Sequence, residues 1–145
     1  MPYSKKLHDY LDQTSVQHQQ LTEKFEEFAH FIRSCLKATS VASNNILVDL
    51  RHLPQRNFTA SFADRTVTFV FNSLLKGDEN LIGNVKCFIH KSFPEDKFIE
   101  IGEFDFDEHG NTNLKLPNED ADINLDNNFG TLHVVLHFIR LSLTL

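Results

Sequence analysis

Two short runs near the middle of the chain, 58–62 and 67–72, alternate apolar and polar side chains. Their apolar members are Phe58, Ala60, Phe62, Val67, Phe69 and Phe71. A period of two in aromatic and β-branched residues is typical of a strand that is buried on one face. A polar break at 63–65 separates the two runs. The pattern therefore predicts an antiparallel β-hairpin over 58–71 as the centre of a sheet.

Residues 3–36 repeat apolar side chains at helical spacing instead. The stripe consists of Leu7, Leu11, Leu21, Phe25, Phe28 and Ile32, with Thr14, His18 and Cys35 completing its spacing. Lys, Asp, Gln and Glu fill the opposite face, so we expect one long amphipathic helix, or two helices if Ser15 caps a second one. A homodimer through this helix is an alternative, since coiled coils use a similar stripe. The polar residues Thr14 and His18 in mid-stripe favour packing on a sheet.

Four further segments have the character of strands, namely 46–50, 85–89, 98–106 and 112–116. In the third of these, the apolar positions change parity across Gly102, from Ile99 and Ile101 to Phe104 and Phe106. An extra residue in one strand of a pair produces such a change, so we predict a β-bulge at Gly102.

The C-terminal segment 131–145 is compatible with either element. Leu132, Val135, Leu136 and Ile139 would line a helix, but the segment is rich in Val, Ile, Thr and Phe and ends in strict alternation. We interpret it as a strand. The chain is then predicted to be a single α+β domain over 1–145, helical in 1–38 and mainly β in 46–145. Its mostly antiparallel sheet would have about six or seven strands.

Composition changes this picture little but adds a cellular setting. Fourteen Phe, two Tyr and no Trp indicate rings that fill a core, because Phe has no polar group to offer at a binding surface. The apolar runs are interrupted by polar residues, and the start of the chain lacks the apolar stretch of a signal peptide, so no membrane partner is expected. Cys35 and Cys87 are isolated in the sequence. We expect reduced thiols and a cytoplasmic location.

Charge is distributed unevenly along the chain. The net charge of −6 arises in residues 93–145, which carry eleven acidic and three basic side chains. Such a segment would repel nucleic acid and would attract a protein with a basic surface. The candidate partner-binding residues are Glu103, Asp105, Asp107, Glu108, Asp120, Asp122 and Asp126.

Part of the acidic third alternates with apolar residues. Asp120, Asp122, Asn124 and Asp126 are separated by Ala121, Ile123 and Leu125. A charged edge strand explains this pattern, because charge on an edge discourages aggregation. A weak Ca²⁺ site formed by the same four side chains is the alternative, and no other cofactor is expected. Residues 105–110 resemble the start of an EF-hand loop, but Leu116 occupies the position where that loop requires Glu.

Two further pairs of side chains are candidates for chemistry. His133 and His137 would share one face of a helix, but the H-E-x-x-H motif is absent, and on a strand they would lie about 13 Å apart. We interpret them as histidines half-covered beside the core. Glu100 and Glu103 would reach one side of the sheet only if the bulge at Gly102 exists. Paired carboxylates in a concave sheet can act as acid and base, but we interpret these two as exposed acids that keep the protein soluble.

These observations favour a non-enzymatic, cytoplasmic protein-interaction module. Its acidic C-terminal third would bind a basic partner, as an immunity protein, an inhibitor or a chaperone does. The alternative is a small-molecule-binding protein or enzyme with a Phe-lined pocket, containing His or Glu, between helix and sheet.

Overall fold

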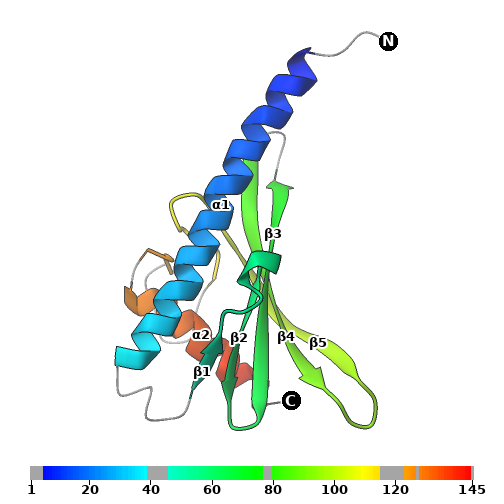
Figure 1. The fold of residues 1–145 in the computed structure, drawn as a ribbon, viewed down its shortest axis with the longest axis vertical. Coiled ribbons are helices and arrows are strands. Elements are labelled where there is room, and N and C mark those ends of the chain that lie inside the picture. The colour runs from blue at the N-terminus through cyan, green and yellow to red at the C-terminus, as the bar shows by residue number, and fades with distance from the viewer. Residues whose placement is uncertain (1–4, 39–45, 77–79, 115–122, 127, 145) are drawn as a thin grey trace.

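A computed structural model describes residues 5–38, 46–76, 80–114, 123–126 and 128–144, with the backbone alone for 35–38 and 128–130. In the order of the chain, one α-helix precedes the strands of the sheet and a second α-helix follows them (Figure 1). The elements are α1 (Lys5–Ala38), β1 (Leu47–Asp49), the 3₁₀ turn η2 (Leu53–Gln55), β2 (Asn57–Phe62), β3 (Arg65–Lys76), β4 (Asn80–Lys91), β5 (Lys97–Phe106) and α2 (Asn128–Ser142). The α+β class predicted from the sequence is confirmed.

The described strands form one antiparallel meander in the order β1-β2-β3-β4-β5. The predicted central hairpin is β2–β3, in which Phe58 pairs with Phe69. Its turn consists of Ala63 and Asp64, whose φ angles of 51° and 65° are both positive. Two-residue hairpin turns with positive φ match the right-handed twist of the strands they join.

The sheet of the described residues has five strands, so the predicted six or seven is too many. The segment predicted as a C-terminal strand is the helix α2, whose fully buried side chains follow a spacing of three and four residues. They are Thr131, Val134, Val135, Phe138, Ile139 and Ser142. The residues of this stripe favour strands, but intrinsic β propensity is a weaker effect than tertiary packing. Burial of the stripe against the core therefore decides in favour of the helix. Within 112–114, Thr112 forms only an isolated bridge to Phe106.

The predicted bulge is present in β5. Cys87 pairs with Gly102 and the next residue of β4, Phe88, pairs with Glu100, so Ile101 is an extra residue in β5. One extra residue reverses the side on which all the following side chains lie. Phe104 and Phe106 are consequently buried on the inward face.

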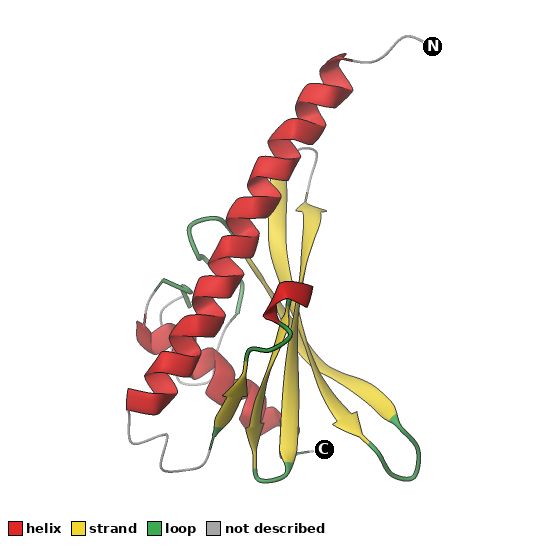
Figure 2. Cartoon of the chain, in the orientation of Figure 1, coloured by secondary structure: helices red, strands yellow, loops and turns green. Residues whose placement is uncertain are grey.

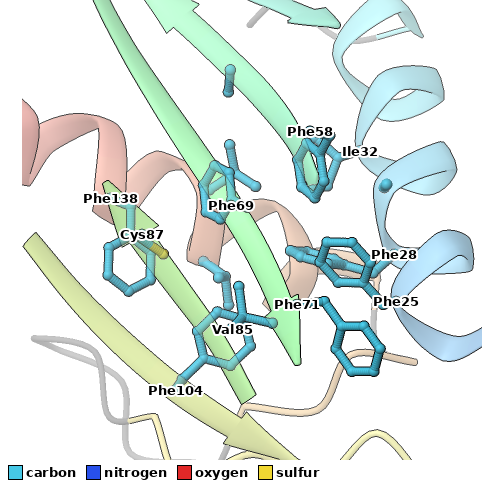
Figure 3. Close-up of a cluster of buried hydrophobic side chains, with 14 of the residues drawn as sticks. Phe25, Phe28, Ile32, Phe58, Phe69, Phe71, Val85, Cys87, Phe104 and Phe138 are labelled. Atoms are coloured by element: carbon cyan, nitrogen blue, oxygen red, sulfur yellow. The ribbon is translucent and has the colours of Figure 1, made fainter. Parts of the chain in front are cut away.

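Phenylalanine rings from both helices and from the strands β2, β3 and β5 form the core, and Val85 and Cys87 of β4 lie among them (Figure 3). Phe25 of α1 stacks on Phe71 at 5.2 Å between ring centroids, and Phe138 of α2 meets Phe69 edge-on at 6.0 Å. Both helices therefore cover the same face of the sheet. Because α1 is one continuous helix, the predicted break near Ser15 does not occur. None of the described helices is long and apolar enough to cross a membrane.

Candidate functional site

The outward face of the sheet, opposite the helices, carries three carboxylates in a row along β5. Glu100 lies opposite Phe88, Glu103 opposite Lys86 and Asp105 opposite Asn84. Residues 84, 86 and 88 alternate along β4 and so share one face. The bulge brings Glu100 to the same side as Glu103. We call Glu100, Glu103 and Asp105 the acidic row.

Asn84 holds two members of the acidic row together. Its side-chain Nδ2 donates hydrogen bonds to Glu103 Oε2 at 3.1 Å and to Asp105 Oδ1 at 2.8 Å. The residue is only 3% exposed, and its Oδ1 is buried without a hydrogen-bond partner. Two carboxylates drawn onto one amide repel each other. A cation or a hydrogen-bond donor placed beside them would relieve that repulsion.

Cationic side chains near the row offset only part of its charge. Lys76 Nζ lies 3.8 Å from Asp105 Oδ2, and Lys86 is the cross-strand neighbour of Glu103. Glu100 and Glu103 are exposed, whereas Asp105 is half-buried. At the opposite end of β5, the ring of Phe98 is 66% exposed and stacks on His90 at 4.9 Å. The outward face thus presents an aromatic side chain beside exposed negative charge.

The other predicted partner-binding acids have different surroundings. Asp107 Oδ1 accepts hydrogen bonds from the backbone N–H groups of His109 and Asn111, at 2.9 and 3.0 Å, and Asp107 Oδ2 accepts one from Asn111 Nδ2. These bonds close the loop after β5, so Asp107 has a structural role. Glu108 is exposed beside it, 3.5 Å from His109 Nε2.

The proposed Ca²⁺ ligands are only partly described. Asp120 and Asp122 lie outside the described residues. Asn124 Nδ2 donates to His109 O and to Asn111 Oδ1, and Asn124 Oδ1 accepts from the backbone of Asp126. Asp126 Oδ1 lies 2.7 Å from Lys24 Nζ of α1. Among the residues that the structure describes, no group of three or more His, Cys, Asp or Glu side chains is placed to hold a metal ion.

The histidine pair and the buried cysteine are associated with the core. His133 and His137 are four residues apart on α2, so they share a helical face, and both are half-buried. Burial, and then the charge of Arg140, lower the pKa of His137. Cys87 is fully buried, and desolvation followed by the charge of Glu100 raises the pKa of its thiol. A protonated, inaccessible thiol is a poor nucleophile.

Three cavities in the described part of the structure lie along α1. One of 260 Å³ separates α1 from the loop after β5 and is lined by Gln17, Leu21, Leu81, Ile82, Glu108 and His109. One of 270 Å³ lies beside Phe28, Phe31, Glu27 and the Lys24–Asp126 ion pair. The third, of 420 Å³, is lined by His30, Arg33, Val48, Asp49 and Arg51. There Arg51 donates to Asp49 and lowers the pKa of that carboxyl to about 2.

Comparisons of the chain with protein-family profiles, with curated proteins and with solved structures found no match. Two members of the outward site, Glu100 and Asn84, were not among the partner-binding residues predicted from the sequence. The parity change at Gly102 was the signal for Glu100, because it places that side chain beside Glu103. Asn84 gave no local signal, since its partners lie about twenty residues further along the chain.

Proposed function

We propose that the protein is a non-enzymatic interaction module that binds a basic surface of a partner protein through the outward face of β4 and β5. The observation that carries this proposal is the acidic row, two of whose carboxylates share the buried amide of Asn84. Holding like charges together costs free energy in the unbound protein. A lysine or arginine of a partner would remove this repulsion on binding, so that the free-energy cost becomes part of the binding free energy.

The surroundings of the row supply the rest of an interface. Binding surfaces typically combine an aromatic anchor with polar groups that fix the orientation of the partner. Phe98 and the half-buried Phe88 provide apolar area beside Glu100 and Glu103. Lys76 and Lys86 would discriminate against partners whose positive charges are placed differently.

We further propose that the protein is cytoplasmic and that it acts as an immunity protein, an inhibitor or a chaperone does. An unpaired, buried Cys87 is compatible with a reducing compartment. A homodimer through α1 is a separate hypothesis, carried by a different surface of the molecule.

Neutralising the row is expected to slow association with the partner. In the variant Glu100→Gln/Glu103→Gln, the rate constant for association should fall by roughly threefold to tenfold at physiological salt. Screening limits the reach of the row to about 8 Å under those conditions, so raising the salt concentration should slow the wild type more than the variant. The partner is first captured from the native host, and the rates are then measured by surface plasmon resonance.

The matched control is Glu23→Gln/Glu26→Gln, which removes the same charge from exposed positions on α1. Its association rate should stay within about twofold of the wild type, because those carboxylates lie on another element. Equal slowing by both double variants would mean that net charge, not the row, drives binding. Unchanged capture by the row variant would exclude the outward face as the binding surface.

A second candidate function is the binding of a small polar molecule in the 260 Å³ cavity. Gln17 lines this cavity together with Glu108 and His109, and its Oε1 is buried without a hydrogen-bond partner. A ligand with an N–H or O–H group would satisfy that acceptor. Screening by thermal shift should then find polar compounds that raise the melting temperature of the wild type but not of Gln17→Leu. Compounds that stabilise both proteins equally would contradict this site.

A further inference from the structure

The cavity of 420 Å³ has basic side chains on two of its walls. It lies between the C-terminal part of α1 and the segment formed by β1 and the residues that follow it (Figure 2). His30 and Arg33 line it from the helix, and Arg51 lines it from the segment after β1. Val48 and Leu50, which are half-buried and pack against the core, add apolar surface. A cavity of this size suits a small organic molecule better than a bare ion.

Asp49 is the only carboxylate among the described lining residues, and Arg51 already engages it. Arg51 Nη2 lies 2.7 Å from Asp49 Oδ2, Arg51 Nε donates to the same oxygen at 2.9 Å, and the backbone N–H of Arg51 donates to Asp49 Oδ1 at 2.9 Å. The side-chain hydrogen bonds, and then the backbone one, lower the pKa of Asp49 to about 2. The carboxylate therefore stays ionised and fixes the guanidinium in place. A guanidinium that is positioned in advance loses less entropy when it binds a ligand.

Both arginines keep donors that a ligand could use. The bonds to Asp49 use Nε and Nη2 of Arg51, which leaves the N–H groups of Nη1. Arg33 is exposed and forms no ion pair with any residue that the structure describes. The net charge of the whole chain is −6, so this pair of cations beside one neutralised carboxylate is a local exception. Guanidinium groups recognise the paired oxygens of carboxylates and phosphates.

We propose that this cavity binds a small organic anion whose phosphate or carboxylate group lies between Arg33 and Arg51. His30 adds a ring N–H from the same wall as Arg33, because residues three apart on a helix are neighbours. The apolar part of the ligand packs on Val48 and Leu50. Such a ligand joins α1 to the segment after β1 and uses both the charged and the apolar lining of the cavity.

This site is independent of the other binding surfaces of the molecule. The acidic row lies on the outward face of the sheet, whereas this cavity lies beside α1, which covers the inward face. The 260 Å³ cavity contains Asp107 and Glu108 and would repel an anion. A partner protein could therefore bind the acidic row while the 420 Å³ cavity is empty, and either function can fail alone.

Nuclear magnetic resonance titration of the full-length protein tests the proposal, with phenyl phosphate, benzoate and inorganic phosphate as the probes. Phenyl phosphate or benzoate should shift the amide signals of residues 30–33 and 48–51 to saturation, with a dissociation constant of roughly 0.1–5 mM. The tighter of the two identifies the anionic group. Inorganic phosphate should bind at least about threefold more weakly, because it has no apolar part to bury.

Variants of the two arginines assign the binding to this cavity. Arg33→Gln/Arg51→Gln should weaken the binding of the tighter probe at least about tenfold, and Arg33→Gln alone about threefold. The single variant removes no ion pair within the described structure, so its melting temperature should equal that of the wild type. The matched control is Lys5→Gln/Lys6→Gln, which removes the same charge from the other end of α1. Its affinity should stay within about twofold of the wild type.

Three results would overturn the proposal. The first is the absence of saturation with both aromatic probes. The second is equal weakening by the arginine and lysine double variants, which would mean that the anions respond to net charge alone. The third is binding of inorganic phosphate as tight as that of phenyl phosphate, which would show that the apolar lining takes no part.

Discussion

Replacing Phe69 by alanine is expected to lower the free energy of unfolding by about 3–5 kcal/mol, the usual cost of removing a buried aromatic ring. The Phe69 ring has no exposed area. It stacks on Phe58 at 4.9 Å between centroids and meets Phe138 edge-on at 6.0 Å. Its removal would leave a cavity at the point where the central hairpin meets α2. Denaturant unfolding followed by circular dichroism gives the difference in stability.

The control for this change is Phe93→Ala. Phe93 is 86% exposed in the turn between β4 and β5, so its replacement should alter stability by no more than about 0.5 kcal/mol. An unfolding midpoint for Phe69→Ala equal to that of the wild type would contradict the assignment of the inward face. Both the alternation of residues 67–71 and the burial of Phe69 give that assignment.

The elements predicted correctly are those whose burial pattern has one clear period. Alternate burial in β2 and β3 follows from their sequence, because a strand presents successive side chains to opposite faces. The bulge could also be predicted from the sequence, because a change of parity at Gly102 has few other causes. Four of the six apolar residues of the α1 stripe, Leu21, Phe25, Phe28 and Ile32, are buried as expected, whereas Leu7 and Leu11 are exposed. A stripe therefore indicates an apolar face without indicating how far along the helix that face is covered.

The segment 131–145 shows where local propensity misleads. Its Val, Ile and Thr residues favour strands, and its last residues alternate. The spacing from Val134 and Val135 to Phe138 and Ile139 suits a helix equally well. Whether the segment forms a helix or a strand depends on which part of the core surface the other elements leave uncovered. No property of the segment itself contains that information.

The candidate site could be predicted only in outline. The excess of acidic residues in the last third was evident from the sequence. Which of them stabilise the fold and which are exposed for binding depends on contacts between positions that are distant in the chain. Asp107 closes a loop and Asp126 pairs with Lys24, whereas Glu103 is exposed on the outward face. The buried amide of Asn84 joins β4 to β5. Its role depends on strand register, which fixes the residues that it faces.

Replacing Gly83 by alanine is expected to lower the free energy of unfolding by about 1–3 kcal/mol, the cost of overpacking a filled core. A Cβ atom at this position would overlap the ring of Phe106, which is the cross-strand partner of Gly83 in β5. That ring is 1% exposed and lies 5.7 Å from Phe71 between centroids, so it has no free space into which to move.

The double variant Gly83→Ala/Phe106→Leu distinguishes this cause from a change in the backbone. Leucine occupies less space than the ring, so the destabilisation of the double variant should be smaller than the sum for the two single variants. The difference should be at least about 0.5 kcal/mol, as expected for residues in contact. Strict additivity would show instead that alanine disturbs β4 itself and that the Phe106 ring is not what excludes a side chain at position 83. Chemical denaturation of all four proteins under one set of conditions provides the comparison.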